Sequence, residues 1–381
     1  MLSILLLINI IGWMIIGSGM FWGLRKIDSL EKSEAVHDGP LVSIIIPARN
    51  EAHTIGKSIQ SQLNLNYKNI EWIIVNDRST DETGAEIARI ASMDYRIKIL
   101  HLTELPKGWL GKNHALYQGY IRSQGELLLF TDADIHFHPD SISKAVNVLQ
   151  SEEADHLTAA PALKAKGFWL KTFIAFFLFG FSYFKRPWKA NDRTSPVGMG
   201  IGAFNLITRS AYKEIGTHER LRNRPDDDLQ LGVKIKEHRL TQRMVTAISL
   251  LSVEWYPTLR SALQGLEKNT FAGLHYRYSM VGLAIAGIFF SQVFPFLALL
   301  APDFGIRLLS SAVILLIFFS YLMVIKKMTD FHPGLFLVLP VTAVIFIFSI
   351  IRAIALTFVR GGVVWRGTKY SLEELRSRIE K

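Results

Sequence analysis

Asp132 and Asp134 are the pair of residues in this chain whose spacing is most suited to chemistry. They follow residues 126–130, a mostly apolar run that is typical of a buried strand. Two carboxylates this close repel each other and resist removal from water, so we expect a cation beside them. Mg²⁺ and Mn²⁺ bind through one or two carboxylates plus substrate phosphates. The pair predicts a metal-bound diphosphate, with a solvated aspartate-rich turn as the alternative.

Three other polar clusters stand beside predicted strands or helices. Residues 47–51 follow one strand pattern, Asn76 and Asp77 follow the next, and the acidic triplet 226–228 precedes a helical pattern. Acidic and amide groups at strand ends can bind a base and a ribose, and a carboxylate of the triplet can take the proton of an incoming hydroxyl. The order of the four clusters favours nucleotide-dependent group transfer over four unrelated turns.

The segments between these clusters alternate between strand and helix patterns. Apolar, β-branched runs predict strands at residues 41–46, 71–75, 97–100 and 126–130. Apolar spacing and capping residues predict helices at 51–63, after 81–83, and at 111–122. This alternation predicts an α/β fold with a mainly parallel sheet and helices on both faces. Ligands of such sheets bind outside the carboxyl ends of the strands, where the polar clusters lie.

The composition indicates a membrane-tethered protein. With 381 residues, 49% of them hydrophobic, the chain is too apolar for a purely soluble protein. Its formal charge of +10 suits anionic lipid or nucleotide substrates, and we expect no nucleic acid partner because no recognition motif for one is present. The absence of cysteine excludes disulfides and thiolate metal sites.

Apolar segments lie at both ends of the sequence. We expect a transmembrane anchor at 1–24, a linker at 25–40, a catalytic domain at 41–278, transmembrane helices within 279–358 (about 280–301, 306–325 and 335–358), and a basic tail at 359–381. The phenylalanine-rich residues 168–184 predict an interfacial helix, with a buried core helix as the alternative. Arg25 and Lys26 after the first segment predict a multi-pass protein of the cell membrane whose catalytic domain is cytoplasmic. Pro340 leaves open whether the last segment crosses the bilayer, and hence on which side the tail lies.

Several blocks of residues carry a resemblance to a known family. Residues 46–51, 75–83 and 131–134 resemble the signature blocks of family 2 inverting glycosyltransferases, which have the GT-A (nucleotide-diphospho-sugar transferase) fold. Residues 108–115 and 364–370 resemble the membrane-bound branch that acts on lipids. That branch includes carotenoid glycosyltransferases of the diaponeurosporenoate type, hopanoid-associated glycosyltransferases and, more distantly, ceramide glucosyltransferases. The resemblance covers residues 41 to about 275, plus the tail.

The resemblance implies a role for each matching residue. Donor binding falls to Pro47, Arg49, Glu51, Asn76, Asp77, Lys112 and Asp132, where Asn76 stands in place of an aspartate of the usual pair. Asp134 is implied as the principal ligand of Mg²⁺ or Mn²⁺, with Asp132 beside it. Asp228 aligns with the catalytic base, and Asp227 is the alternative because the register is open by one residue. On the acceptor side we place Gly200, Gly202, Trp109 and Trp365.

The implied reaction is transfer of one sugar from a UDP- or GDP-sugar to the hydroxyl of a carotenoid, hopanoid or glycerolipid-like lipid, with inversion of the anomeric carbon. The Gln-x-x-Arg-Trp motif of processive polysaccharide synthases is absent, which argues for a single transfer. The alternatives are a polyprenyl-phosphate glycosyltransferase, a glycosyltransferase of polysaccharide synthesis, and a catalytically inactive scaffold that binds nucleotide-sugar or lipid.

Overall fold

The computed structural model describes residues 1–274, 277–365 and 368–371, and the chain divides into two compact units. The first unit, Met1–Trp22, Ala165–Phe184 and Glu254–Lys381, contains most of the long apolar helices. The second unit, Gly23–Lys164 and Lys185–Val253, contains the large sheet and the polar clusters.

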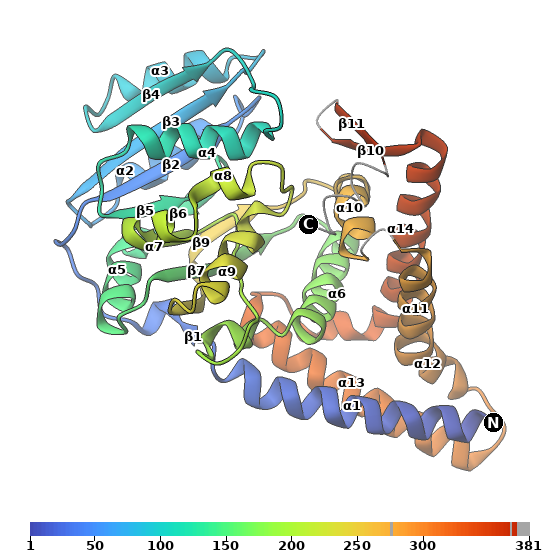
Figure 1. Ribbon diagram of the computed structural model, residues 1–381. Helices are drawn as coiled ribbons and strands as arrows, with labels where there is room; N and C mark the ends of the chain where they lie inside the picture. The colour runs from blue at the N-terminus through green and yellow to red at the C-terminus, as the bar shows by residue number, and fades with distance from the viewer. Residues whose placement is uncertain (275–276, 366–367, 372–381) are drawn as a thin grey trace. The chain divides into compact units, whose positions relative to one another are not determined.

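The sheet of the second unit has nine strands in the order β1-β9-β7-β8-β5-β2-β3-β4, with β6 beside β9 (Figure 1). The strands are β1 (Asp28–Ser29), β2 (Val42–Ala48), β3 (Ile70–Asp77), β4 (Ile97–Leu102), β5 (Leu127–Phe130), β6 (His136–Phe137), β7 (His156–Lys164), β8 (Asn205–Thr208) and β9 (Gln242–Glu254). Strands β5, β2, β3 and β4 run parallel, as predicted. Strand β8 pairs antiparallel with both β5 and β7, so the sheet as a whole is mixed.

Helices cover both faces of this sheet because successive strand residues point to opposite sides. Ile44 and Ile46 of β2 pack in one core with helices α2 (Ile55–Leu63), α3 (Thr83–Ala91) and α5 (Ser141–Ser151). Ile45 packs in the other core with α4 (Gly111–Arg122), α7 (Arg209–Glu214) and α9 (Asp227–Glu237). Two shorter elements, α8 (Thr217–Leu221) and the 3₁₀ turn η2 (Pro187–Asn191), also belong to this unit.

The first unit is mostly helical. Its elements are α1 (Leu2–Leu24), α6 (Phe168–Lys185), α10 (Leu259–Gly273), α11 (Tyr278–Ile288), the π-helical turn η3 (Phe289–Val293), α12 (Phe294–Ala298), α13 (Phe304–Met328), the 3₁₀ turn η4 (Pro333–Val338), α14 (Leu339–Arg360), and the antiparallel hairpin of β10 (Gly362–Trp365) and β11 (Thr368–Ser371). Five described segments are long and apolar enough to cross a bilayer: residues 2–24, 168–185, 278–298, 304–328 and 333–360.

Two details of these helices bear on the sequence predictions. Pro340 stands in the first turn of α14, a position that suits proline, so the helix begins there and continues to Arg360. The 3₁₀ turn η4 stands just before it, and the crossing of the bilayer by this segment stays a prediction. Arg352 of α14 is ion-paired with Glu267 of α10, which neutralises a charge inside an otherwise apolar helix.

Candidate active site

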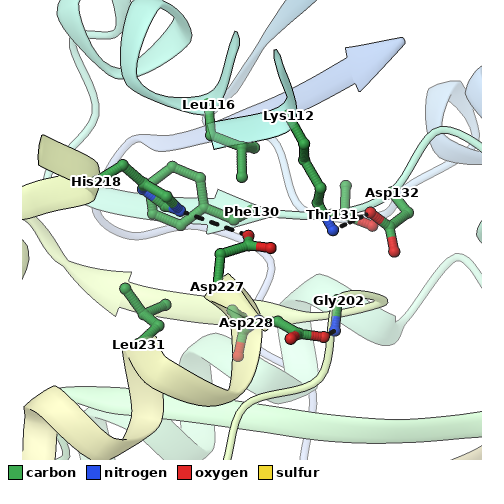
Figure 2. Close-up of a pocket in the computed structure, with 11 residues that line it drawn as sticks. Lys112, Leu116, Phe130, Thr131, Asp132, Gly202, His218, Asp227, Asp228 and Leu231 are labelled. Carbon is green, nitrogen blue, oxygen red and sulfur yellow. Dashed lines mark hydrogen bonds and ion pairs between the residues drawn. The ribbon is translucent and has the colours of Figure 1, made fainter. Parts of the chain in front are cut away.

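Three acidic side chains and one lysine meet at the carboxyl end of strand β5. Asp132 follows the strand directly, Lys112 belongs to the first turn of α4, and Asp227 and Asp228 open helix α9. They line a pocket together with Leu116, Phe130, Thr131, Gly202, Asn205, His218 and Leu231 (Figure 2). The structure thus brings together residues of two of the predicted polar clusters, at 132 and at 227–228, with Lys112, which is 116 residues before Asp228 in the sequence.

Lys112 is the cation of this pocket. Its Nζ lies 2.7 Å from Asp132 Oδ1, and its side chain is largely buried. Burial alone would lower the pKa of Lys112, but the charges of Asp132, Asp227 and Asp228 outweigh it and raise that pKa above its usual value. Lys112 therefore stays charged and partly neutralises the three carboxylates, which otherwise repel one another.

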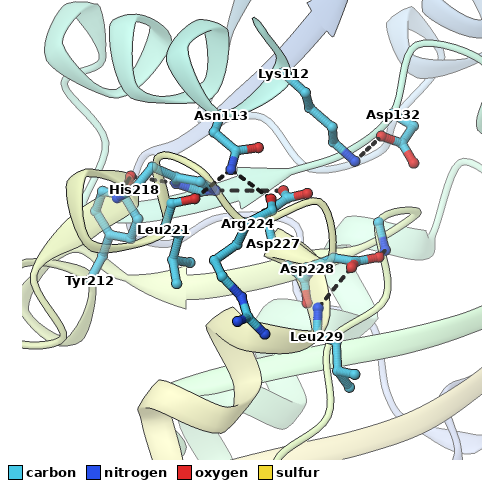
Figure 3. Close-up of polar contacts among 12 residues, drawn as sticks. Lys112, Asn113, Asp132, Tyr212, His218, Leu221, Arg224, Asp227, Asp228 and Leu229 are labelled. Carbon is cyan, nitrogen blue, oxygen red and sulfur yellow. Dashed lines mark hydrogen bonds and ion pairs between the residues drawn. The ribbon is translucent and has the colours of Figure 1, made fainter. Parts of the chain in front are cut away.

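Asn113 anchors α4 to the segment that leads into α9. Its buried side chain donates hydrogen bonds to the carbonyls of Leu221, at 2.5 Å, and Arg224, at 2.9 Å (Figure 3). The backbone N–H of Leu110 donates to the Arg222 carbonyl at 2.7 Å. These bonds fix the start of α4, and so Lys112, relative to the acidic start of α9.

Asp227 is held from the other side by a buried histidine. His218 Nε2 lies 3.8 Å from Asp227 Oδ2, and His218 Nδ1 lies 2.6 Å from the Tyr212 hydroxyl (Figure 3). That hydroxyl also accepts the backbone N–H of His218, so Tyr212 fixes the orientation of the ring and keeps Nε2 facing Asp227. Burial raises the pKa of Asp227, but Lys112 and His218 outweigh it, and the net shift is downward. Asp227 is therefore a paired carboxylate.

Asp228 has a different environment. Its Oδ2 accepts the backbone N–H of Gly202 at 2.9 Å, and its Oδ1 accepts that of Leu229 at 2.8 Å. Burial, followed by the charge of Asp227, raises the pKa of Asp228 to about 6. A carboxylate with that pKa is ionised at neutral pH and still basic enough to accept a proton. Of the two aspartates, Asp228 therefore has the properties of a general base.

Asp134 is not among the residues that line this pocket, but it lies close enough to Asp132 to interact with its charge, and it has the chemistry of a cation ligand. Burial, followed by the charges of Asp132 and Glu51, raises its pKa to about 7. Among the residues described, no three His, Asp or Glu side chains gather into a metal cluster. Mg²⁺ and Mn²⁺ need no such cluster when substrate phosphates supply further oxygens. The donor set of Asp132 and Asp134 fits a divalent ion of that kind.

Comparison with known proteins identifies the family. Residues 43–216 match the profile of Glycosyl transferase family 2. A 4,4'-diaponeurosporenoate glycosyltransferase of Staphylococcus aureus is 25% identical over 345 residues, 87% of this chain and 89% of that protein. Residues 43–216 thus form a glycosyltransferase family 2 domain, and the chain is a glycosyltransferase. An uncharacterized glycosyltransferase of Haemophilus influenzae is 39% identical over a shorter stretch of 120 residues, 32% of this chain and 35% of that protein.

The solved structure of a mannosyltransferase from Pyrobaculum calidifontis, in complex with GDP-Man and Mn²⁺, shares the fold of this glycosyltransferase. The TM-score is 0.54 at 15% identity, and the match covers 94% of this chain and 99% of that chain. The predicted GT-A fold is thereby confirmed.

The predicted donor-binding residues fall into two groups in the glycosyltransferase. Asp77 is buried at the end of β3, where Arg78 donates to both of its carboxylate oxygens at 2.7 and 3.0 Å and Arg49 lies 4.0 Å away. A Cβ on Gly111 would lie 2.4 Å from Asp77 Oδ2, which places Asp77 beside the first residue of α4, directly before Lys112 in the sequence. Pro47 lies one strand over, in β2. These residues share the strand ends that lead to the pocket.

Asn76 and Glu51 belong to the second group. The Asn76 side chain contacts His101 at 3.2 Å and accepts the N–H of Ser79, so it supports the turn after β3. The backbone N–H of Glu51 donates to Thr83 Oγ1 at 2.7 Å, and its carboxylate accepts from Thr54. Their contacts within the chain are those of turn residues, and their predicted roles toward the donor stay predictions.

The acceptor-side residues are spread more widely. Gly202 lines the pocket, whereas Gly200 packs against the backbone of Asp228, where an added Cβ would lie 1.7 Å from its carbonyl oxygen. The Trp109 ring stacks on Tyr117 at 5.2 Å and is not among the residues that line the pocket. The side chain of Trp365 lies outside the described part of the chain. The acceptor roles of all four stay predictions.

Sequence reasoning missed His218, Tyr212 and Asn205. Each is a lone polar residue without a neighbouring motif, and its place at the site depends on β8, α7 and α8, which no local pattern predicted. The spacing of nine residues from His218 to Asp227 carries no chemical meaning until the chain is folded, so no sequence signal could have found His218.

Proposed function

We propose that this glycosyltransferase transfers a single sugar from a nucleoside-diphosphate sugar to a hydroxyl group of a membrane lipid, with inversion. The observation that carries the proposal is the placement of Asp228 in a pocket whose other wall is formed by Lys112 and Asp132. One side of the pocket offers a base, and the other offers groups suited to a diphosphate.

The mechanism that these residues support is a direct displacement. The acceptor hydroxyl attacks the anomeric carbon, its proton passes to the carboxylate of Asp228, and the bond to the leaving diphosphate breaks on the opposite side. The ammonium group of Lys112 stabilises the negative charge that develops on the leaving diphosphate. Asp132 holds this ammonium group in place before the donor binds. A single displacement inverts the anomeric configuration.

Asp134, with Asp132 beside it, would hold the divalent ion. When bound, such an ion supplies positive charge to the diphosphate. A carboxyl with a raised pKa must lose its proton to bind a cation, and Asp134 is of that kind. The mannosyltransferase of the same fold, solved with GDP-Man and Mn²⁺, supports a metal and a nucleotide-sugar donor for this chain.

A lipid acceptor and a membrane location are supported by two independent features. The five apolar segments have the length and composition of membrane spans. The relative that aligns with 87% of the chain is named for a carotenoid acid, 4,4'-diaponeurosporenoate, which supports an apolar lipid acceptor. Because that name specifies a carboxylate, the choice of a hydroxyl as the accepting group rests on Asp228 and not on this relative. With Arg25 and Lys26 following α1, we place the catalytic unit on the cytoplasmic side of the cell membrane.

The test of this function replaces the base and leaves its neighbour as a control. Asp228→Asn should bind nucleotide-sugar as well as wild type but transfer sugar at least about 100-fold more slowly, because the hydroxyl proton has no acceptor. Asp226→Asn changes the same acidic triplet, but Asp226 pairs with Arg224 and Gln230 and does not line the pocket. Its rate should match wild type.

Near-normal turnover by Asp228→Asn would contradict the proposal. It would favour an acceptor that is already an anion, such as a polyprenyl phosphate, since a phosphate oxygen needs no base.

A further inference from the structure

The peptide groups of Gly202 form hydrogen bonds with both Asp228, the proposed base, and Asp132, a proposed donor-binding residue. Its N–H donates to Asp228 Oδ2 at 2.9 Å, and its carbonyl accepts the backbone N–H of Asp132 at 3.1 Å (Figure 2). The distance between the proposed base and the donor-binding motif therefore depends on where one loop, residues 198–204, is held.

This loop packs backbone to backbone against α9. An added Cβ on Gly198 would lie 2.1 Å from the Gly232 carbonyl oxygen, and one on Gly200 would lie 1.7 Å from that of Asp228. Side chains at these positions would push the loop away from the helix. The glycines thus permit the backbone of this loop to approach α9, the helix that carries Asp228.

Three buried polar side chains hold the loop from the sheet side. Gln242 of β9 accepts the N–H of Met199 at 2.9 Å and donates to the Met199 carbonyl at 2.8 Å. Thr158 of β7 accepts the N–H of Ile201 at 3.0 Å, and Asn205 of β8 donates to the Ile201 carbonyl at 2.9 Å. All three side chains are almost fully buried, so these bonds are not shared with solvent.

His156 of β7 joins two of these side chains. Its Nδ1 lies 2.7 Å from Gln242 Nε2, which donates to it, and its Nε2 lies 3.1 Å from Asn205 Oδ1, to which it donates. His156 is completely buried and does not line the pocket. Burial lowers the pKa of His156 to about 4, so the ring stays neutral with one donor and one acceptor at working pH.

We propose that His156 is a positioning residue for catalysis: through Gln242 and Asn205 it fixes the loop 198–204, and so sets the Gly202 peptide that holds Asp228 at its distance from Asp132. A buried polar network of this kind costs desolvation and would be replaced by apolar packing if only stability mattered. The inference rests on the proposed function, in which Asp228 is the base.

The test compares two buried polar residues of the same unit. His156→Leu removes both hydrogen bonds and should lower kcat about tenfold or more, because small displacements of reacting groups are costly. The donor Kd should stay within about twofold of wild type, since His156 contacts none of the proposed donor-binding residues.

Gln62→Leu is the matched control. Gln62 is fully buried, accepts from Trp72 and contacts Ser58, but lies in the core formed with α2, away from the pocket. This variant should lose comparable thermal stability while keeping its kcat.

Thr158→Val is a second variant that keeps side-chain volume and removes only the hydroxyl bound to Ile201 and Phe204. It should show the same loss of kcat with unchanged donor Kd, because it releases the loop that His156 is proposed to hold. If His156→Leu does not fold, Gln242→Leu, which breaks the link from His156 to Met199, takes its place with the same expected result. Activity losses that follow the losses of Tm across all three variants, or donor binding that weakens as much as turnover, would overturn the inference. Absence of transfer by wild type would instead refute the proposed function, and the inference with it.

Discussion

The pH dependence of transfer follows from the environment of Asp228. Burial and the charge of Asp227 raise the pKa of this carboxyl to about 6, and the base acts only when it is unprotonated. With that pKa, about 90% of Asp228 is ionised at pH 7 and about 10% at pH 5, so kcat/KM should fall about ninefold between these pH values. An ordinary aspartate, with a pKa near 4, would give almost no change over the same range.

The assay is kcat/KM for the acceptor at pH 5 to 8, with donor and divalent metal kept saturating and donor binding checked separately at pH 5. Asp228→Asn serves as control, because its residual activity should lack the acid limb near pH 6. A flat wild-type profile from pH 5 to 8, with donor binding intact, would refute the assignment of Asp228 as a base with a raised pKa.

Three further predictions concern charge, stability and topology. Lys112→Met should weaken donor binding, measured by titration calorimetry, and should shift the acid limb to higher pH, because the charge of Lys112 lowers the pKa of Asp228. Asp228→Asn should raise the Tm more at pH 8 than at pH 4. The folded-state pKa of Asp228 exceeds its unfolded value, so the folded state loses stability as the pH rises from about 4 to about 6, by at most about 3 kcal/mol, and the loss is complete above pH 6. Calorimetry at both pH values measures this difference, and an equal change in Tm at pH 4 and pH 8 would contradict the raised pKa of Asp228. Because the chain has no cysteine, Ser92→Cys, at an exposed position after α3, should react with a membrane-impermeant maleimide in inverted vesicles and stay unlabelled in intact cells. Labelling only in intact cells would place the catalytic unit outside.

The parallel half of the sheet was predictable because its strands are buried on both faces and read as continuous apolar runs. Helix α4 was predicted with its observed bounds, 111–122. Helix α2 begins at Ile55 rather than at residue 51, because residues 49–54, which include Arg49 and Glu51, form the turns between β2 and the helix.

The antiparallel half escaped prediction for a physical reason. Strand β7 contains Pro161 and several alanines, which have low strand propensity, and β8 has only four residues. Their pairing depends on contacts with residues distant in sequence, such as Leu128 with Ile207.

The site residues divide in the same way, into those visible in the local sequence and those that depend on contacts between distant segments. Asp132, Asp134 and Asp228 were predictable because carboxylates at strand or helix ends are conspicuous in sequence. His156 and His218 act through hydrogen bonds to residues that only the fold brings near, so their types alone carry no signal.

The central claim is tested most directly by transfer of radiolabelled sugar from a panel of UDP- and GDP-sugars into the lipids of membranes that contain the wild-type chain or Asp134→Ala. We predict a labelled glycolipid that forms only with wild type and a divalent metal, and whose anomeric configuration is opposite to that of the donor. A wild-type chain that binds nucleotide-sugar but labels no lipid, or a product that retains the donor's configuration, would contradict the account.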